Sequence, residues 1–369
     1  MPVTKLYIDK EVEDYSNVRE FSSRIDLEGE IVDDQQVIFD IIQESSDPIQ
    51  KAKEVIFLTR NKGAFIKKCP GTSIYTCCGY KILHIGTFCD MDCSYCILQT
   101  YFHPPIMQYF VNHIDMMTEL DRIFEEKAIH RVGTGEFTDS LIWEKWTDIA
   151  SKLVTKFSKQ NNSILELKSK TVNIKKLENL NHNGKTILAW SMNTPHVIKE
   201  EEKDTTPLKA RLRAAQKVES WGYKLAFHFD PMVFYDNCHE EYKDVVRQIF
   251  KNVSPENVAY ISIGSFRFMP DLKQIIQKRF KESTLVYGEF IHGLDNKMRY
   301  FKPLRLKMYQ AIVSEIKLLA PDVLVYFCME DDEIWEKTFG FVPDKDEGLS
   351  KMLDKRVAKL CGLNKGLLI

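Results

Sequence analysis

Three cysteines that could bind a metal cluster stand close together in the segment GTFCDMDCSYCILQTYF, directly after an apolar run. Cys89, Cys93 and Cys96 have the spacing C-x3-C-x2-C, which brings three thiolates into one short loop without a fourth. Thiolates hold iron–sulfur clusters, and a 4Fe–4S cluster normally takes four of them. Three ligands leave one iron with an open coordination position, as a catalytic metal site requires. The spacing therefore predicts a 4Fe–4S cluster with one open iron.

A zinc site or a group of buried thiols is the alternative interpretation of this spacing. Zinc ligands usually come as a C-x2-C pair with a second Cys or His pair at a distance. The nearby residues that could supply such a pair are Cys69, Cys77, Cys78, His84 and His103. The C-x3-C step, with the aromatic Tyr95 beside the third cysteine, favours the iron–sulfur cluster.

The elements that position these cysteines alternate regularly from about residue 80. Short apolar runs alternate with amphipathic stretches, which predicts repeated βα units around a parallel sheet. The apolar runs cover residues 81–88, 129–137, 163–170, 186–193, 224–232 and 258–266. The helical stretches between them include 115–127, 239–252 and 207–221, the last framed by Pro207 and Gly222. We expect an α/β fold, an incomplete (β/α)6 barrel.

The chain is predicted to have three parts. Residues 1–79 form an N-terminal extension and residues 80–270 form the partial barrel. A C-terminal α+β part covers residues 271–369. Landmarks outside the barrel are a strand at 54–59, apolar runs at 284–290 and 323–329, a helix over 304–319 and an acidic tract at 330–333, expected to be a solvated turn or helix start.

Polar residues follow several of the apolar runs, where ligands of βα sheets bind. The segment Gly133-Thr134-Gly135-Glu136 follows the second run; its glycines allow close backbone approach to a ligand, although a simple turn is the alternative. Further candidates are Thr138, Lys170 after the third run, Ser191 and Asn193 after the fourth, and Asp230 at the end of the fifth. Lys170 could neutralise a carboxylate or could be a solvated lysine, and Ser191 and Asn193 could bind ribose hydroxyls or serve a turn.

The remaining thiols also allow two interpretations each. Cys69, Cys77 and Cys78 could hold a second metal ion, although buried small thiols are the commoner case. Cys238 and Cys328 follow strand-like runs, and each is either an inert core thiol or a donor of a hydrogen atom.

The composition limits the classes of partner. The chain of 369 residues has a net charge of −2 and a pI near 6.5, so nucleic acid is disfavoured but not excluded. No run of eighteen apolar residues is present, which predicts no membrane span. Nine cysteines and an N-terminus without an apolar export segment predict a cytoplasmic protein that uses thiols for metal rather than for disulfides.

The cysteine spacing resembles that of the radical S-adenosylmethionine (radical SAM) superfamily, in which the open iron chelates the amino and carboxylate groups of S-adenosylmethionine. Four segments extend the resemblance to the spore photoproduct lyase family: KKCPGTSIYTCCGYKILHIGTFCDMDCSYCILQTYF, GTGEFTDSL, SMNTPHVIKEEEKDTTPLKARLRAAQKVESWGYKL and GSFRFMPDLKQIIQKRF. This resemblance implies an open radical SAM barrel and an electron donor such as flavodoxin or ferredoxin. It also implies a position near S-adenosylmethionine for Tyr95, Gly133, Gly135, Thr138, Lys170, Ser191 and Asn193.

The chain departs from this family at three places. Glu136 stands where the lyases carry the cysteine that returns a hydrogen atom to the product radical, and Ile97 stands where they carry a tyrosine. Residues 299–309, RYFKPLRLKMY, keep only the basic and aromatic character of the Arg-Tyr pair that contacts the dinucleotide in those enzymes. These departures predict that the protein does not repair spore photoproduct efficiently.

Three functions remain open from the sequence. The first is a radical SAM enzyme that generates a 5′-deoxyadenosyl radical for an unidentified substrate. Its pocket for an anionic or aromatic substrate would draw on Glu136, Asp230, Arg267, Arg299, Tyr300 and Arg305. The second is a DNA photoproduct lyase with a different hydrogen donor, and the third is a non-catalytic metal-binding scaffold.

Overall fold

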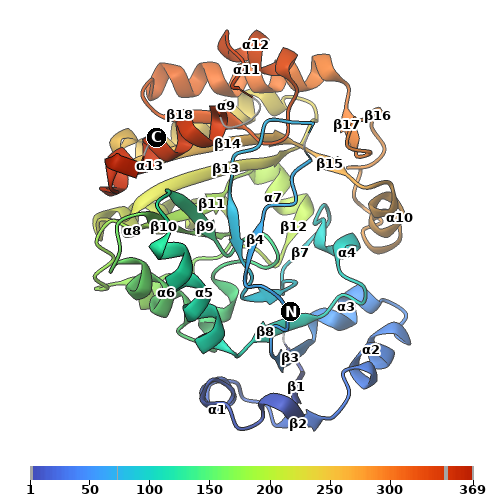
Figure 1. The fold of residues 1–369 in the computed structure, drawn as a ribbon. Helices are drawn as coiled ribbons and strands as arrows, with labels where there is room; N and C mark the ends of the chain where they lie inside the picture. Colours follow the sequence, from blue (N-terminus) through green and yellow to red (C-terminus); the bar gives the residue numbers. More distant parts are fainter. Residues whose placement is uncertain (1–2, 73, 345–347, 368–369) are drawn as a thin grey trace.

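The computed structural model describes residues 3–72, 74–344 and 348–367. Its centre is an eight-stranded sheet of order β18-β14-β13-β11-β10-β9-β5-β4 (Figure 1). Six of these strands are parallel and follow one another both in the sheet and along the chain. They are β5 (Lys81–Leu83), β9 (His130–Gly133), β10 (Ser163–Ser169), β11 (Thr186–Ser191), β13 (Lys224–Met232) and β14 (Val258–Ser265). The sheet curls into a half barrel, and the predicted incomplete (β/α)6 barrel is confirmed.

Burial on both faces explains why these strands appear as continuous apolar runs. All residues of β11 and β14 are buried, as expected for parallel strands covered on both sides. The main covering helices are α5 (His113–Glu125), α6 (Ile149–Phe157), α8 (Leu208–Ser220) and α9 (Cys238–Asn252). Shorter connections are α7 (Pro195–Glu201), η2 (Ile142–Lys145), η3 (Lys175–Leu177) and η4 (Pro255–Asn257). Helix α8 begins directly after Pro207 and is followed by Gly222, whose φ of 91° favours glycine.

Two further strands extend the barrel sheet at its edges. β18 (Leu324–Phe327) pairs in parallel with β14, and β4 (Ile66–Lys68) pairs antiparallel with β5. Both strands come from segments outside the predicted barrel limits of 80–270. The pairing of β18 places Cys328 at the same edge of the sheet as the carboxyl ends of β13 and β14.

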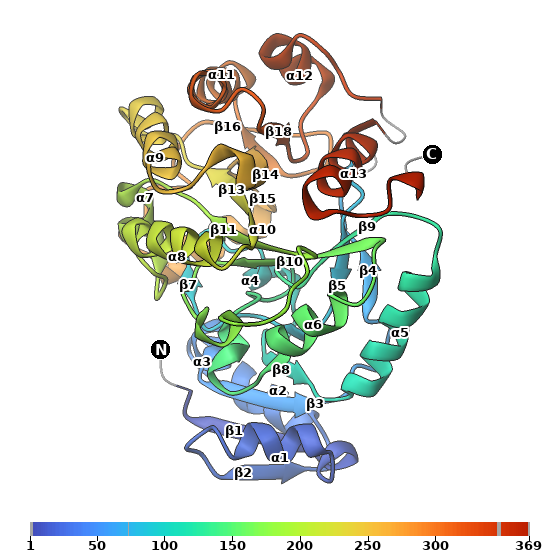
Figure 2. The ribbon, with the colours of Figure 1, turned by 90° about the vertical axis from the view of Figure 1, so that its left-hand side faces the viewer.

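A second sheet of order β2-β1-β3-β8-β6 lies at the N-terminal end of the molecule (Figure 2). Its strands are β1 (Lys5–Asp9), β2 (Gly29–Val32), β3 (Val55–Thr59), β6 (Gly86–Thr87) and β8 (Met107–Phe110). Its helices are η1 (Lys10–Val12), α1 (Ser16–Ser22), α2 (Gln36–Gln43) and α3 (Pro48–Lys53). Because β6 and β8 follow the first barrel strand, this sheet fixes the segment that carries the three cysteines.

The C-terminal part closes the opposite end of the molecule. A small sheet combines β15 (Arg267–Phe268), β16 (Phe290–His292) and β17 (Met298–Tyr300). The helices are α10 (Pro270–Arg279), α11 (Lys302–Leu319), α12 (Asp332–Phe339), α13 (Gly348–Cys361) and η5 (Lys365–Leu367). Most of the apolar run at 284–290 forms turns, and the strand begins only at Phe290. Within the described ranges, no helix is both long enough and apolar enough to cross a membrane.

Candidate cofactor and substrate site

The three cysteines lie in a loop that we call the cluster loop, residues 89–96. It leads from β6 to α4 (Leu98–Tyr101) and contains the short strand β7 (Asp92–Cys93). β7 pairs antiparallel with β12 (Glu202–Lys203), which follows the fourth barrel strand. This pairing attaches the cluster loop to the carboxyl edge of the barrel, where the βα pattern predicts a ligand site.

Side chains outside the cluster loop bind its backbone carbonyl groups. Gln99 Nε2 donates hydrogen bonds to the carbonyl oxygens of Cys93 (3.2 Å), Ser94 (2.9 Å) and Cys96 (3.4 Å). Lys53 Nζ donates to the carbonyl oxygens of Cys89 and Met91. All three cysteines are free of disulfides. These bonds hold the loop by its backbone and leave the sulfur atoms for ligation.

The spacing of the thiols distinguishes between the two metal interpretations. Among the residues that the structure describes, no three Cys, His, Asp or Glu side chains converge on a point that could hold a metal ion. A single zinc ion needs ligands that converge on one point, whereas the thiolates of a 4Fe–4S cluster bind different iron atoms. The choice of an iron–sulfur cluster over zinc therefore rests on the C-x3-C-x2-C spacing of the cluster loop.

Arg279 connects the cluster loop to two other parts of the chain. Its guanidinium group, 5% exposed, donates to the carboxylate of Asp47 (2.9 and 3.1 Å) and to that of Asp92 (3.1 and 3.3 Å). It also donates to Gln99 Oε1. Asp47 accepts from Gln50 at the start of α3, so one arginine from α10 joins the N-terminal segment to the loop. No local pattern around Arg279 predicts this role.

A buried carboxylate network lies directly beneath the cluster loop. The Tyr95 hydroxyl donates to Glu202 Oε1, and Arg211 Nη2 donates to Glu202 Oε2 at 2.5 Å. Burial opposes the charge of Glu202, but Arg211 and then Lys170 hold its pKa below its ordinary value. Asn193 Nδ2 donates to Glu202 Oε1 (3.2 Å) and to the Pro231 carbonyl (3.0 Å). The amide group of Asn193 thus supports the loop from below.

Lys170 lies beside this network and acts on the Glu202 carboxylate without a direct ion pair. Its ammonium group is 5.6 Å from the centroid of the Tyr95 ring and has no ion pair among the described residues. Burial raises the pKa of Cys93 to about 12, and the Lys170 charge is the largest opposing influence. The Lys170 backbone N–H donates to Asp139 Oδ2 at 2.8 Å. The structure therefore brings Lys170 to the cluster loop, as predicted for a cofactor ligand.

Ser191 and Thr138 lie in the same region but differ in their hydrogen bonds. The Ser191 carbonyl accepts from Arg211 Nη1 at 2.8 Å, while its hydroxyl has no hydrogen-bond partner within the described part of the chain. Thr138 Oγ1 accepts from Trp143 Nε1 at 3.1 Å. Ser191 is 8% and Thr138 3% exposed, so Thr138 acts from within the packed wall.

The two glycines after β9 have a packing role. A Cβ atom at Gly133 would lie 1.6 Å from the Tyr80 hydroxyl, and one at Gly135 would lie 2.9 Å from Lys168 Cβ. Real Cβ atoms do not approach other heavy atoms so closely, so neither position admits a larger residue without rearrangement. The missing side chains thus make room for neighbouring protein atoms, and cofactor contact through the backbone of these glycines stays a prediction.

Alternation along β10 arranges the barrel interior in three rows. Successive strand residues point to opposite faces, so Glu166 and Lys168 of β10 point to the same side, and Lys170 directly follows the strand. We call Lys170 with the cluster loop the cofactor row. The middle row contains Lys168, Glu136, Asp230, Arg267 and Cys328, and the lower row contains Glu166, Tyr80, His228 and Tyr260.

The charged residues of the middle row are joined in ion pairs. Lys168 pairs with Glu136, and Arg267 forms two hydrogen bonds with Asp230 at 3.0 and 3.1 Å. Burial opposes the charge of Asp230, yet Arg267 holds its pKa below the ordinary value. Three of the six predicted substrate residues, Glu136, Asp230 and Arg267, therefore lie together.

Hydrogen bonds to one carboxylate close the lower row. Glu166, 1% exposed, accepts from the Tyr80 hydroxyl (3.1 Å) and from the Tyr260 hydroxyl. His228 Nε2 lies 3.5 Å from Glu166 Oε2. Burial opposes ionisation of Glu166, but His228, Lys168 and the Tyr260 hydroxyl together lower the pKa of Glu166 to about 2.

Two further substrate candidates lie beside a different cavity of about 480 Å³. Arg299 donates to Asp295 Oδ2 (2.7 Å) and Arg305 donates to both carboxylate oxygens of Glu330 at 3.1 Å. Arg299 is 2% and Arg305 3% exposed. Both guanidinium groups are thus already neutralised within the protein, on the C-terminal side of the barrel.

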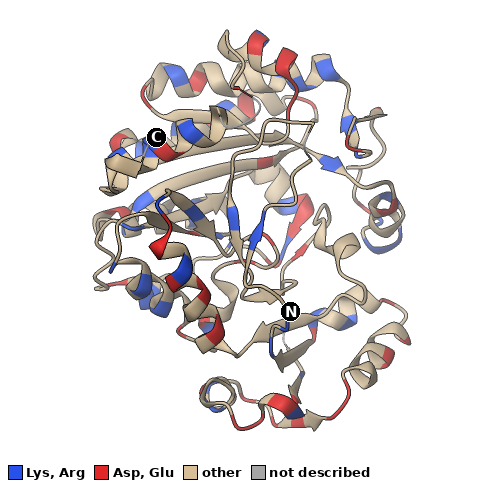
Figure 3. Ribbon diagram, viewed as in Figure 1, with Lys and Arg blue, Asp and Glu red and all other residues tan. Residues whose placement is uncertain are grey.

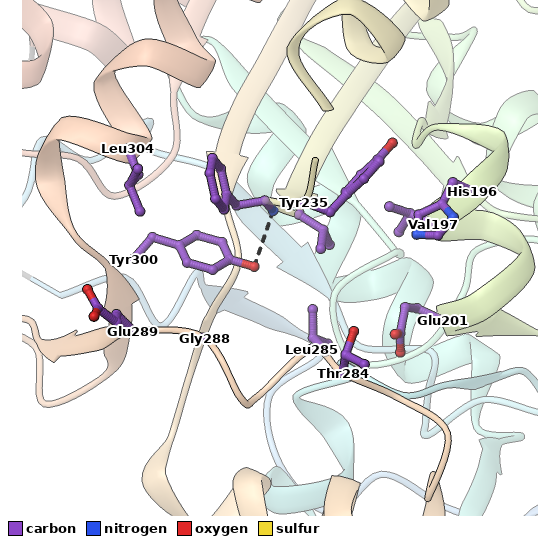
Figure 4. A pocket seen from close by; sticks show the side chains of 12 residues that line it. His196, Val197, Glu201, Tyr235, Thr284, Leu285, Gly288, Glu289, Tyr300 and Leu304 are labelled. Atoms are coloured by element: carbon purple, nitrogen blue, oxygen red, sulfur yellow. Dashed lines mark hydrogen bonds between the residues drawn. The ribbon is translucent and has the colours of Figure 1, made fainter. Parts of the chain in front are cut away.

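Tyr300 lines a third location, a cavity of about 310 Å³ between α7, residues 233–235 and residues 284–289 (Figure 4). Its hydroxyl accepts from the Phe234 backbone N–H at 3.2 Å. Glu201 borders the same cavity, and its side chain accepts hydrogen bonds from Ser94 of the cluster loop and from Ser283. The six predicted substrate residues therefore occupy three separate places.

A half barrel of parallel strands with three cysteines in the loop after its first strand defines the radical SAM class of enzymes. The family model of spore photoproduct lyase matches residues 73–302, more than half of the chain. The chain belongs to the spore photoproduct lyase family.

Curated relatives agree with this assignment. The spore photoproduct lyase of Clostridium acetobutylicum is 27% identical over 223 residues, which cover 60% of this chain and 64% of that protein. The spore photoproduct lyase of Bacillus subtilis is 27% identical over 210 residues, 55% of this chain and 61% of that protein. The match thus spans less than two thirds of each relative.

Solved structures share the fold over a longer stretch. A spore photoproduct lyase variant with bound AdoMet and dinucleoside spore photoproduct has a TM-score of 0.78 at 20% identity, covering 89% of this chain and 99% of its own. The lyase complexed with dinucleoside spore photoproduct also has a TM-score of 0.78, at 19% identity, covering 89% and 100%. At these identities the likeness supports the fold.

Proposed function

We propose that this chain is a radical SAM enzyme that binds a 4Fe–4S cluster through Cys89, Cys93 and Cys96. With S-adenosylmethionine at its open iron, such a cluster supplies a 5′-deoxyadenosyl radical. The observation that carries the proposal is the cluster loop, whose carbonyl groups are held by Gln99 and Lys53 while its thiols remain free. The family membership supports the same chemistry.

The residues around the cluster loop would bind and orient the cofactor. Lys170 offers an ammonium group that suits the carboxylate of S-adenosylmethionine. The Ser191 hydroxyl is available for a ribose hydroxyl. Tyr95, Glu202 and Arg211 hold the loop in place, and burial of this network keeps water away from the reacting atoms.

The substrate would occupy the space next to the middle row. Glu136, Asp230 and Arg267 border it, and their charges are paired within the protein. In the view of Figure 3, Lys and Arg are mixed with Asp and Glu over most of the molecule. Mixed charge of this kind gives no extended track for a phosphate backbone and favours a small or locally bound substrate.

A DNA photoproduct lyase with a different hydrogen donor is the second candidate function. The relatives' names and their complexes with dinucleoside spore photoproduct favour it. The presence of Glu136 in place of a thiol argues against efficient repair, because an ionised carboxylate has no hydrogen atom to give. Poor repair of spore photoproduct stays a prediction, as do a cytoplasmic location and an electron donor of the flavodoxin or ferredoxin type.

One anaerobic experiment tests the proposed function. The protein is reconstituted with iron and sulfide, reduced with dithionite and incubated with S-adenosylmethionine. We expect equal amounts of 5′-deoxyadenosine and methionine, and neither product without iron. A cluster-loaded, reduced protein that leaves S-adenosylmethionine intact would overturn the proposal and favour the non-catalytic scaffold. Addition of dinucleoside spore photoproduct to the same mixture tests the second candidate through the release of thymidines.

A further inference from the structure

The pairing of β18 with β14 places Cys328 in the barrel interior. It directly follows β18, and its backbone N–H donates to the Ile263 carbonyl of β14 at 2.9 Å. Tyr326, two residues earlier, packs its ring 5.9 Å from that of Tyr260 in the lower row. Because strand residues two apart share a face, Cys328 lies one row above Tyr326, in the middle row.

An ion pair contacts the Cys328 thiol. Arg267 Nη2 lies 3.5 Å from Cys328 Sγ, while the same guanidinium group is fixed by Asp230. A Cβ atom at position 264 would lie 2.8 Å from Arg267 Nη1 and 2.9 Å from Asp230, so Gly264 makes room for this arrangement. The Cys328 thiol therefore lies in a packed environment that the Arg267–Asp230 pair and Gly264 define.

Cys328 keeps its hydrogen at neutral pH. Burial raises the pKa of its thiol to about 12, and Asp230 adds to this increase against the opposing charge of Arg267. Cys77 behaves in the opposite way, because a hydrogen bond from Cys78 lowers its pKa to about 5. A thiolate has no S–H hydrogen to give, so Cys77 is unsuited to hydrogen-atom transfer.

Two of the other thiols belong to helices. Cys238 is fully buried at the start of α9, and Cys361 is 3% exposed at the end of α13. Cys69 lies beside the middle row, because the charges of Glu136 and Lys168 act on its thiol, whose pKa burial raises to about 12. Cys328 differs from Cys69 in its contact with the Arg267–Asp230 pair. Rows two residues apart along a strand are separated by about 7 Å, so the middle row is nearer to Lys170 than the lower row is.

We propose that Cys328 is the hydrogen-atom donor of this enzyme. The proposal rests on the proposed function and adds a residue to it. The hydrogen atom of the S–H bond forms a C–H bond with the substrate-derived carbon radical, and sulfur keeps one unpaired electron. One electron from the low-potential one-electron donor that also feeds the cluster, with one proton from water, restores the thiol.

The charged side chains of the middle row are poor hydrogen-atom donors, and Cys328 is the thiol in contact with the Arg267–Asp230 pair. The carboxylates of Glu136 and Asp230 are held in ion pairs, and the N–H bonds of Lys168 and Arg267 are strong. A thiol S–H bond is the weakest bond to hydrogen among these side chains. Cys328 therefore supplies what the acid at position 136 does not.

Substrate-free cleavage of S-adenosylmethionine in D2O tests this donor without knowledge of the substrate. In D2O the thiol becomes S–D, and the 5′-deoxyadenosyl radical takes this deuterium, so that 5′-deoxyadenosine gains one mass unit. We expect the deuterated fraction of 5′-deoxyadenosine to fall by about tenfold or more in Cys328→Ala. A tenfold slower deuterium transfer corresponds to an activation free energy that is higher by about 1.4 kcal/mol. Cys328→Ser, which keeps the side-chain volume but has a strong O–D bond, should show the same loss.

Cys238→Ala and Cys69→Ala are the matched controls and should keep the deuterated fraction of the wild type. A deuterated fraction that stays unchanged in both Cys328 variants, or that falls only in Cys69→Ala, overturns the assignment of Cys328. Absence of 5′-deoxyadenosine from the wild type overturns the proposed function itself. Mass spectrometry thus separates the two failures.

Discussion

The cofactor row and the middle row of the barrel differ in how their charges are balanced. In the cofactor row, the ammonium group of Lys170 lies 5.6 Å from the Tyr95 ring and forms no ion pair among the described residues, and the cluster cysteines are free of disulfides. In the middle row, Lys168 is paired with Glu136 and Arg267 with Asp230. A largely buried charge is costly unless it is paired, so the first arrangement awaits an anionic ligand and the second is complete. The difference separates cofactor binding from the environment of the substrate.

The largest expected effect comes from the cluster thiols. Replacing Cys89, Cys93 and Cys96 together with Ala should abolish the iron-dependent visible absorbance and the cleavage of S-adenosylmethionine, because the cluster has no other ligands in the loop. Iron analysis and absorbance after anaerobic reconstitution measure the first effect. Replacement of Cys69, Cys77 and Cys78 with Ala is the matched control. Loss of the cluster in that variant would show that these cysteines, and not those of the cluster loop, bind it.

Arg211 should matter next, because it neutralises the carboxylate beneath the cofactor row. Arg211 and Glu202 are both fully buried at their side chains and lie 2.5 Å apart. Arg211→Met leaves the Glu202 charge unpaired, and we expect a loss of about 3–5 kcal/mol in the free energy of unfolding. Urea unfolding followed by circular dichroism measures it.

Arg213→Met on the exposed side of the same helix is the control, with an expected change within about 0.5 kcal/mol. Glu202→Gln added to Arg211→Met should recover part of the loss, since it removes the unpaired charge. If Arg211→Met and Arg213→Met have the same free energy of unfolding, the Arg211–Glu202 pair does not stabilise the protein, and this prediction is wrong.

Lys170→Ala should weaken S-adenosylmethionine binding by about 10- to 100-fold, the cost of one charge-assisted hydrogen bond of about 1.5–3 kcal/mol. The cluster content should stay that of the wild type, because the three cysteine ligands remain and the hydrogen bonds of Gln99 and Lys53 to the loop carbonyl groups do not involve Lys170. Calorimetric titration of the reconstituted protein measures the affinity. Lys175→Ala, at an exposed position, is the control. If Lys170→Ala binds S-adenosylmethionine as tightly as Lys175→Ala does, Lys170 is not a ligand of the cofactor.

The smallest effect concerns the protonation of two thiols. The pKa of Cys77 is lowered to about 5 and that of Cys328 is raised to about 12. Iodoacetamide reacts with thiolates, so alkylation of Cys77 should already be at its plateau at neutral pH. Alkylation of Cys328 should increase by about tenfold per pH unit in the alkaline range. Peptide mass spectrometry follows both rates, and rapid neutral alkylation of Cys328 would show that it is not held as a thiol.

The sequence predicts the barrel well because its signal is local. The six apolar runs match strands that are buried on both faces, and Glu166, Lys168 and Lys170 show in one run the alternation that produces the three rows. Strand β18 was assigned outside the barrel, because its pairing with β14 joins segments distant in the sequence. The position of Cys328 in the middle row depends on that pairing.

The candidate site was predicted less completely, because the partners of its charged residues lie far away in the chain. Arg305 is paired with Glu330, which is 2% exposed, so the expectation of a solvated tract at 330–333 is wrong for Glu330. The glycines after β9 pack against Tyr80 and Lys168, a contact that no local pattern contains. Arg279 and Glu202 were missed for the same reason.

Electron paramagnetic resonance of the reduced cluster tests most directly whether three cysteines leave one iron open to S-adenosylmethionine. The wild-type protein is reconstituted, reduced and measured before and after addition of saturating S-adenosylmethionine. Direct binding at the open iron predicts a clear change in the spectrum of the cluster. A spectrum that S-adenosylmethionine leaves unchanged would show a fourth protein ligand on the iron and contradict the proposed role of the cofactor row.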